Sequence, residues 1–230
     1  MKIKELEKYK PITFKLRKRL SDHEMKSNSE QFYENISSRH TIRQFNERKI
    51  PFSIIKNCIN AARLAPSGAN QQPWHFTVIS NSLIKSEIRK AAEKEERKFY
   101  NKMKNDEWIR ALEPLGTNSS KPHLEKAPWL IVVFSERYGV LKNGKKFKHY
   151  YVPESVGISI GFLITALHLS GLYCLTRTPN PMGFLTKICK RPSSNKPILI
   201  LAVGHPEKNA TIPLASTIKK NIDDVMTILD

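Results

Sequence analysis

A short segment that could bind an anion lies near the start of the chain, with the sequence Ser-Arg-His-Thr-Ile-Arg over Ser38–Arg43. Arg39 and Arg43 supply guanidinium groups, whose planar set of donors matches a phosphate, and Thr41 adds a hydroxyl. An exposed basic turn has the same composition, because charged side chains usually lie on the surface. The segment is therefore a candidate phosphate site that needs support from the residues around it.

A loop rich in proline and small polar residues, Ala65–Pro73, is the second candidate. Two prolines bracket a glycine here, which excludes a regular helix or strand. The turn at Ser67–Ala69 exposes backbone N–H groups and lets a ligand approach the chain closely, while Asn70 and Gln71 can bind the polar edge of a ring. Viewed alone, the loop is also typical of a tight connection between a helix and a strand.

The third candidate lies on a long charged helix in the first half of the chain. Glu96 and Tyr100 are four residues apart, so they share one face of this helix. Together with Lys121, they would select a free amino acid: the carboxylate pairs with its ammonium, while the phenol and the amine hold its carboxylate. On spacing alone Glu93 and Glu95 are rivals of Glu96, and a solvated charged helix is the simpler interpretation.

Length and composition restrict the rest of the molecule. The chain has 230 residues, of which 40% are hydrophobic, enough for the core of one domain. We expect no bilayer-spanning helix, because no apolar run reaches about eighteen residues, and no secretory signal. Cys58, Cys174 and Cys189 are widely spaced and odd in number, which favours reduced thiols and argues against a zinc site. We expect a cytoplasmic protein without a metal, with a basic arm over 1–26 and a single domain over 27–230.

The charge of the chain is strongly positive. Thirty-nine basic and 21 acidic residues give a formal net charge of +18. Such a charge can attract nucleic acid, an anionic surface or anionic small molecules. The cations are scattered rather than blocked, and no nucleic-acid-binding motif accompanies them. A solvated basic surface is therefore favoured, and a basic protein that binds nucleic acid is kept as a lesser alternative.

The apolar pattern predicts helices and strands that alternate along the chain. Apolar residues recur at helical spacing from Pro51 to Leu64, and the charged helix is expected over 82–104. The stretch 105–127 contains two prolines and a glycine and is typical of a lid. The remaining elements are strands at Trp74–Ser80, Trp129–Phe134, Leu172–Thr176 and Ile198–Val203, and helices over 154–170 and 181–190. This order indicates an α/β or α+β sandwich with a central sheet.

Three segments together resemble the flavin-binding signatures of the nitroreductase superfamily: Arg39–Arg43, Ala65–Trp74 and Thr176–Pro179. Within this superfamily the chain is most similar to the iodotyrosine deiodinase branch, from about Phe32 to His205. The resemblance implies an α+β fold, in which a central mixed sheet is flanked by helices and two chains intertwine as a homodimer. It also implies FMN at the subunit interface and an electron donor such as NAD(P)H or a reductase.

The resemblance implies which residues hold FMN. The phosphate would lie against Arg39, His40 and Thr41, and against Lys219 near the C-terminus, for which Lys220 is the alternative. His40 stands where a second arginine is common, so we expect its contact to be weaker and pH-dependent. The flavin ring would contact Arg43 near N1 and O2, Ser67 and Gly68, the hydroxyl of Thr176 at N5, and Thr178 along the same edge.

The resemblance also implies a substrate site. The backbone of Ala69 would donate to a substrate phenolate, and a lid over 96–121 would carry Glu96, Tyr100 and Lys121 onto the amino-acid end of the substrate. The expected activity is reductive removal of a halogen from a halogenated tyrosine, with Thr176 as the catalytic residue. A general NAD(P)H-dependent nitroreductase is the alternative within the same superfamily.

Overall fold

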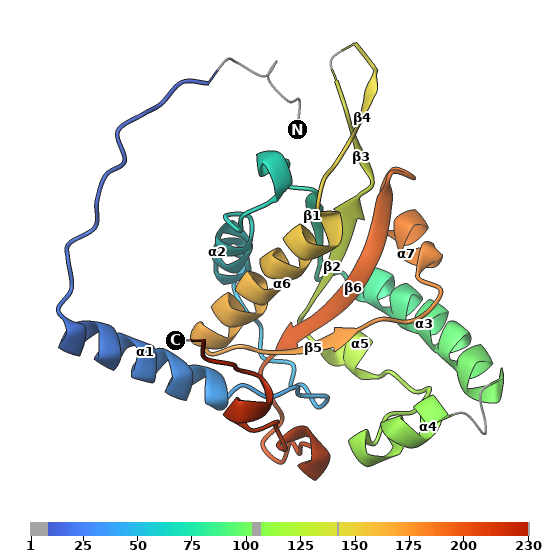
Figure 1. Cartoon of the computed structure of the whole chain (residues 1–230). Helices are drawn as coiled ribbons and strands as arrows, with labels where there is room; N and C mark the ends of the chain where they lie inside the picture. The colour runs from blue at the N-terminus through green and yellow to red at the C-terminus, as the bar shows by residue number, and fades with distance from the viewer. Residues whose placement is uncertain (1–8, 103–106, 142, 230) are drawn as a thin grey trace.

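A four-stranded sheet forms the centre of the computed structural model, which describes residues 9–102, 107–141 and 143–229. The sheet has the order β1-β2-β6-β5 (Figure 1), and its strands are β1 (Trp74–Ile79), β2 (Trp129–Glu136), β6 (Asn195–Gly204) and β5 (Tyr173–Arg177). The two middle strands contain apolar runs and most of their residues are buried, because helices cover both faces of the sheet. β5 lies at one edge of the sheet.

The paired strands are antiparallel throughout the described sheet, whereas a mixed sheet was expected. The parallel component is a single bridge between Thr41 and Cys174, which places the segment around Thr41 alongside β5. The sequence did not fix these directions, since a continuous apolar run suits any strand that is buried on both faces. The bridge matters for the site, because it brings a candidate phosphate-binding segment to the edge of the sheet.

Helices cover the two faces of the sheet with separate apolar cores. On one face α2 (Phe52–Ala62) and α6 (Val152–Leu169) pack against the sheet. The other face is covered by α3 (Ser82–Lys102), α5 (His123–Lys126) and α7 (Gly183–Ile188). The shorter elements are η1 (Gly68–Asn70), α4 (Glu107–Leu112), η2 (Glu113–Leu115), the hairpin β3 (Tyr138–Val140) and β4 (Lys146–Lys148), η3 (Leu214–Ser216) and η4 (Ile222–Asp224).

Helix α6 is the one described helix that is apolar and long enough to cross a membrane by length and composition. It packs into the core through residues such as Leu163 and Leu167, which are fully buried. Gly157–Gly161 on this helix reads Gly-x-Ser-x-Gly, a pattern that also occurs at the exposed nucleophile of serine hydrolases. Here Ser159 is fully buried in the middle of the helix and donates to the carbonyl of Ala62 at 2.9 Å, so the serine has a packing role.

The opposite side of α6 is open to solvent. Ile158 and Phe162 are 43% and 45% exposed, and the space beside Gly157 and Gly161 holds no atom within 4 Å of an added Cβ. Helix α1 (Asp22–Ser37), which begins within the expected arm behind a capping box at Ser21, buries no residue. These surfaces are apolar faces that the described part of one chain leaves uncovered.

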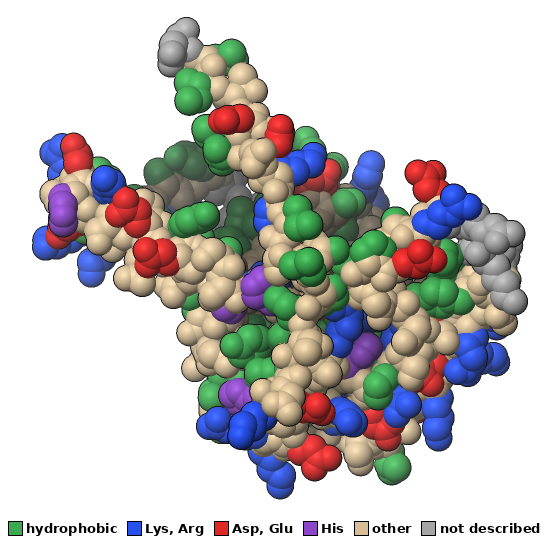
Figure 2. All heavy atoms as spheres, turned by 90° about the horizontal axis from the view of Figure 1, so that it is seen from below, with side chains coloured by type: hydrophobic (Ala, Val, Ile, Leu, Met, Phe, Trp, Pro, Cys, Tyr) green, Lys and Arg blue, Asp and Glu red, His purple; other side chains and the backbone are tan. Residues whose placement is uncertain are grey.

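Both terminal segments carry exposed large hydrophobic side chains. Figure 2 shows the C-terminal segment projecting from the body with hydrophobic side chains along it, and Figure 1 shows the N-terminal segment extended away from the sheet. The exposed residues include Tyr9, Ile12, Phe14 and Leu16 before α1, and Ile218, Ile222, Val225, Met226, Ile228 and Leu229 near the C-terminus. A monomer gains nothing from apolar side chains in these positions, so they favour burial against another chain.

Candidate functional site

A cavity of about 250 Å³ lies between the lid and the end of β5. The lid contributes two of the predicted residues, Glu96 and Tyr100, from the last turns of α3, and β5 with the loop after it contributes Thr176 and Thr178. The remaining lining residues are Phe99, Trp108, Leu112, Thr117, Arg177 and Asn180. Residues about eighty positions apart in the sequence thus surround one space, with aromatic and apolar side chains beside carboxylate and hydroxyl groups.

A second cavity, of about 570 Å³, adjoins the first and shares Thr117 and Arg177 with it. Its lining includes three cationic side chains, Arg43, Lys121 and Arg177, and the buried His123. One carboxylate, the exposed Glu113, also belongs to it. The shared residues place the two cavities next to each other, and the second gives the candidate site a positively charged end.

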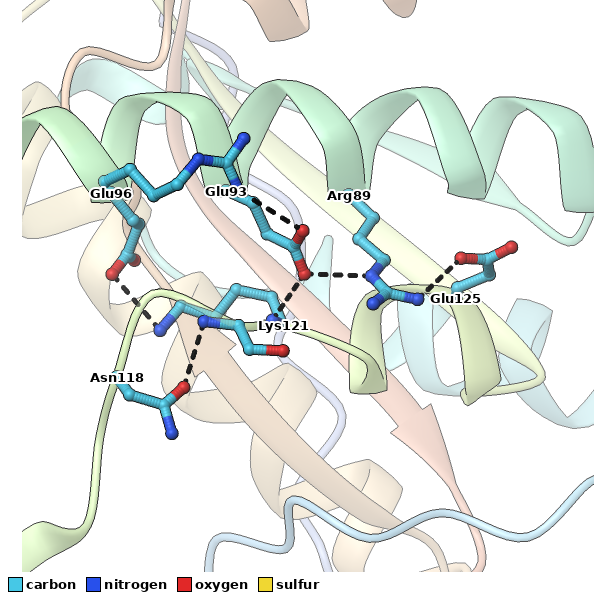
Figure 3. Close-up of polar contacts among 8 residues, drawn as sticks. Arg89, Glu93, Glu96, Asn118, Lys121 and Glu125 are labelled. Carbon is cyan, nitrogen blue, oxygen red and sulfur yellow. Dashed lines mark hydrogen bonds and ion pairs between the residues drawn. The ribbon is translucent and has the colours of Figure 1, made fainter.

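Glu96 is bound by two cations, one on each carboxylate oxygen. Its Oε2 lies 3.2 Å from the Nζ of Lys121, and its Oε1 accepts a hydrogen bond from the guanidinium of Arg177. Figure 3 shows the first of these contacts, with Glu96 pointing from α3 toward the amine. The Lys121 side chain is only 2% exposed, so the Glu96 pair is largely removed from water.

The backbone at Lys121 is held by a second carboxylate of α3. Glu93 Oε1 accepts a hydrogen bond from the Lys121 backbone N–H at 2.7 Å and one from Arg89 Nε at 2.9 Å (Figure 3). The Nη1 of Arg89 donates a further hydrogen bond to the Oε2 of Glu125 on α5 at 3.0 Å. Of the three carboxylates that spacing left open, Glu93 therefore fixes the lid backbone, Glu95 pairs with Lys98 at 2.9 Å, and Glu96 lines the cavity.

Tyr100 contacts both arms of the lid. Its hydroxyl lies 3.1 Å from the Thr117 Oγ1, and its ring lies 5.9 Å from the Nζ of Lys121, within the range of a cation–π contact. Phe99 beside it makes an edge-on contact with Trp108 on α4, with ring centroids 5.1 Å apart. These aromatic contacts connect α3 to the part of the lid that follows residues 103–106, which lie outside the described residues.

Burial and like charges control the ionisation of the site. Burial, together with Arg177 and Arg43, lowers the pKa of Lys121 to about 8, although Glu96 raises it. Burial and the nearby charges of Arg177, Lys121 and Arg43 lower the pKa of His123 to about 3. The pKa of Arg43 is also lowered, by burial and by Arg177. His123 is therefore neutral at pH 7, and the positive end of the site is suited to an anionic ligand.

Two residues of the site were missed by the sequence analysis. Arg177 lies between the predicted Thr176 and Thr178, and a cation at the end of a strand leading into a predicted site was a usable signal. His123 is buried and its Nε2 has no hydrogen-bond partner in the described structure. A lone histidine two residues after Lys121 gave no comparable signal, because its burial depends on the packing of α5 under the sheet.

The predicted loop Ser67–Ala69 lies elsewhere in the same chain, at η1 and near the start of α6. The Gly68 N–H donates to the Ser155 hydroxyl at 3.2 Å, and a Cβ at Gly68 would lie 2.5 Å from the carbonyl oxygen of Tyr150. Ala69 has a left-handed backbone with φ of 50°. Neither cavity at the β5 end includes this loop. In Figure 1 it lies above α2 and α6, while α4 lies at the lower right.

The predicted phosphate-binding residues come from the segment next to β5 and from the C-terminal segment. Arg39, His40 and Thr41 lie side by side on the segment next to β5, where the charge of Arg39 acts on Cys174. Lys219 is exposed, donates to the Ser216 carbonyl at 2.7 Å and lines neither cavity. Lys220 is also exposed. Their contact with a phosphate remains a prediction.

The residues at the β5 end fit the flavin end of FMN. Arg43 supplies a half-buried cation, the His123 Nε2 is an unsatisfied polar atom that lines the same cavity, and hydroxyl groups follow along Thr176 and Thr178. A planar ring with an anionic edge would satisfy these groups. The predicted donors of Ser67–Ala69 line neither cavity at this end of the same chain.

Comparisons with known proteins identify the family of the chain. The Nitroreductase family model matches residues 36–205. An iodotyrosine deiodinase from Haliscomenobacter hydrossis is 50% identical over 190 residues, covering 83% of this chain and 86% of the relative, and one from Hydra vulgaris is 38% identical, covering 92% and 78%. A crystal structure of oxidised iodotyrosine deiodinase bound to FMN and 3-iodo-L-tyrosine is similar with a TM-score of 0.72 and 29% identity, covering 86% of this chain and 97% of the other.

Proposed function

Because the chain belongs to the nitroreductase family and, within it, to the iodotyrosine deiodinases, we propose that it is an FMN-dependent oxidoreductase that removes halogen from halogenated tyrosines. The observation that supports this proposal most directly is that Glu96 and Tyr100 line the same cavity as Thr176, while Lys121, which lines the second cavity, contacts both Glu96 and the Tyr100 ring. A carboxylate, an amine and a phenol in contact can bind both charges of an amino-acid zwitterion.

The protein residues act by binding and orienting the substrate. Glu96 binds the ammonium, while Lys121 and the Tyr100 hydroxyl bind the carboxylate, and the backbone of Ala69 donates to the phenolate. The lid over 96–121 then excludes water from the ring. It belongs to a single domain over 27–230, which follows the basic arm. Fixing both ends of the substrate aligns its carbon–halogen bond before electrons arrive.

Bound FMN would supply the two electrons that, with a proton, replace the halogen by hydrogen and release a halide. Arg43 would hold the N1–O2 edge of the ring, and its positive charge favours an anionic reduced ring. The Thr176 hydroxyl would donate at N5, with Thr178 beside it. Arg39, His40, Thr41 and Lys219 would hold the phosphate. NAD(P)H or a separate reductase in the cytoplasm would return the electrons.

A homodimer would unite two half-sites, the loop Ser67–Ala69 and the cavities at the β5 end. Ser67, Gly68 and Ala69 lie away from the lid of their own chain, so a second copy would bring its loop to the β5 end. The exposed face of α6, which carries Ile158 and Phe162, and the apolar terminal segments provide surface for such a contact. A symmetric dimer would form two equivalent sites, each completed by both chains.

Iodide release from 3-iodotyrosine by the dithionite-reduced protein tests this function. We expect kcat/KM to fall by about tenfold to a hundredfold in Glu96→Gln and in Lys121→Ala, because each change removes a hydrogen bond to a charged group. Glu95→Gln is the matched control, since Glu95 pairs with Lys98 and lines neither cavity. No iodide release by the wild type, or rates near the wild type in both site variants, would contradict the proposal.

A further inference from the structure

Glu93 attaches Lys121 to α3 through the backbone. Its Oε1 accepts a hydrogen bond from the Lys121 N–H at 2.7 Å (Figure 3), and its side chain is only 15% exposed. Glu96, one turn later on the same helix, contacts the amine of Lys121 instead. The two carboxylates therefore hold the same residue at different points, one at its backbone and one at the end of its side chain.

The two contacts differ in what an amino-acid ligand does to them. In the proposed complex Glu96 faces the ammonium and Lys121 faces the carboxylate, so contacts with the ligand replace part of the ion pair between them. The Glu93 contact uses a backbone N–H, which takes no part in binding the ligand. Glu93 can therefore keep Lys121 beside α3 both before and after the ligand binds. The same helix carries Glu96 and Tyr100, so the three ligand-binding groups keep their spacing.

Glu93 is itself held in place by Arg89. The Arg89 Nε donates to Glu93 Oε1 at 2.9 Å, and its Nη1 donates to Glu125 on α5 at 3.0 Å. Burial opposes the ionisation of Glu93, but the Lys121 N–H and Arg89 outweigh it and hold the pKa of this carboxyl below its usual range. The acceptor at the Lys121 backbone is therefore an ionised carboxylate of fixed direction, which makes a strong hydrogen bond.

The chain on either side of Lys121 is restricted as well. Pro122 follows it and begins α5, and a residue before proline is confined largely to extended conformations. On the other side, the Asn118 Oδ1 accepts a hydrogen bond from the Ser120 N–H at 2.9 Å, which fixes the turn before Lys121. Glu93 links this restricted segment to a helix position 28 residues earlier in the chain.

We propose that Glu93 is a positioning residue for substrate binding, which holds the backbone of Lys121 against α3 so that its ammonium stays within reach of the substrate carboxylate after Glu96 has bound the substrate ammonium. This inference rests on the proposed function, because it concerns the same lid and the same ligand. It adds a residue that acts through Lys121 and is not among the described lining residues of either cavity.

A double-mutant cycle on the affinity for 3-iodotyrosine tests the inference, with calorimetric titration of the FMN-loaded protein as the measurement. We expect Glu93→Ala to raise the dissociation constant by about tenfold in the wild-type background, but by less than about twofold in the Lys121→Ala background, where no amine remains to be positioned. Glu93→Gln keeps an oxygen that can accept the backbone N–H, so it should restore most of the lost affinity. Glu95→Gln is the matched control and should bind like the wild type, since Glu95 pairs with Lys98.

A purely structural role of Glu93 predicts a different pattern. The link between α3 and α5 would then matter equally with and without the Lys121 amine, so an equal loss of affinity in both backgrounds would overturn the inference. A Glu93→Ala protein that binds 3-iodotyrosine like the wild type would overturn it too. If Glu93→Ala does not retain FMN, Arg89→Met, which frees the carboxylate, takes its place in the cycle with the same expected dependence on the amine.

The wild type and Lys121→Ala separate failure of the inference from failure of the proposed function. If the wild type binds 3-iodotyrosine and Lys121→Ala weakens this binding, independent effects of Glu93 and Lys121 overturn the inference alone. A wild type that does not bind 3-iodotyrosine, or a Lys121→Ala protein that binds it equally well, would overturn the proposed role of the lid and the inference with it.

Discussion

Lys121 combines deep burial with a charge that the proposed substrate contact requires. Burial is the largest cause of its lowered pKa, about 8, so the amine loses its proton within an accessible pH range. Below this pKa the ammonium is present and binds a carboxylate. Above it the amine is neutral, and the affinity for a carboxylate ligand falls as the pH rises.

We therefore expect the dissociation constant of 3-iodotyrosine to increase by up to about tenfold per pH unit above pH 8 in the wild type. Lys121→Arg should show a much smaller pH dependence, because arginine keeps its charge over this range. Calorimetric titrations of both proteins from pH 7 to pH 10 make the comparison, and ionisation of the ligand phenol is common to both. Parallel profiles would show that Lys121 does not control the pH dependence.

His123 makes a prediction about stability. Its pKa is about 3 in the folded protein and near its ordinary value of 6.5 in the unfolded chain, so the unfolded state takes up the proton first as the pH falls. Above about pH 6.5 the neutral His123 makes its full contribution to the free energy of unfolding. This contribution decreases as the pH falls from 6.5 toward 3. Between pH 7 and pH 5 the loss is up to about 2 kcal/mol.

His123→Phe should remove this part of the acid sensitivity, as measured by urea unfolding at pH 7 and pH 5 with saturating FMN. His23→Gln is the matched control, because His23 lies on the exposed helix α1. An equal loss of stability in the wild type and His123→Phe would contradict the assignment of a neutral buried imidazole.

At the scale of single residues, the sequence pointed to several side chains that line the cavity, but it did not predict the charged contacts between them. Glu96, Tyr100, Thr176 and Thr178 were singled out from the chain, and they do line one cavity. Their roles toward a ligand remain predictions. The Arg177 contact was missed because it joins β5 to α3 across about eighty residues, and no local pattern reports which side chain a strand end will meet.

Among the elements, the buried strands were the most predictable. The apolar runs at Trp129–Phe134 and Ile198–Val203 lie within β2 and β6, and each strand extends one to three residues beyond its run. The β3–β4 hairpin was missed, because strands of three residues are too short for their apolar pattern to stand out. The antiparallel pairing was missed because strand direction depends on the connections and not on composition.

The contact between α3 and α4 makes a prediction about the lid. Trp108 is 56% exposed, so Trp108→Ala should leave the core intact, but it removes the edge-on contact with Phe99. An aromatic pair of this kind contributes about 0.5–1.5 kcal/mol, which predicts an increase of about twofold to tenfold in the dissociation constant of 3-iodotyrosine.

FMN retention should be unchanged in Trp108→Ala, because its effect belongs to the lid. Leu83→Ala, at an exposed position near the start of α3, is the control and should bind 3-iodotyrosine like the wild type. If Trp108→Ala bound the ligand with wild-type affinity, the α3–α4 contact would have no part in holding the lid.

At the scale of the whole molecule, one chain divides the predicted cofactor residues between two places. Ser67–Ala69 is fixed at the start of α6, where Gly68 has no room for a side chain, whereas Arg43 and Lys121 line the cavity at the end of β5. A homodimer that exchanges these half-sites predicts complementation between two impaired variants. Gly68→Val damages one half-site, and Lys121→Ala damages the other.

Mixed dimers of Gly68→Val and Lys121→Ala, made by co-expression, should recover about a quarter of the wild-type rate of iodide release, because half of the dimers are mixed and each contains one intact site. The separately purified variants, mixed without subunit exchange, are the control. Activity that stays at the level of the single variants, in dimers shown to be mixed, would place each complete site within one chain.

The central claim is that a lid holds an aromatic amino acid against the cofactor. The most direct test is a titration of the purified, FMN-loaded protein with 3-iodotyrosine, followed by the visible absorption of the flavin. We predict a yellow protein whose flavin spectrum changes saturably with the ligand, and a Glu96→Gln variant that needs about tenfold more ligand for the same change. A protein that stays colourless with FMN, or a yellow protein whose spectrum is indifferent to 3-iodotyrosine, would contradict it.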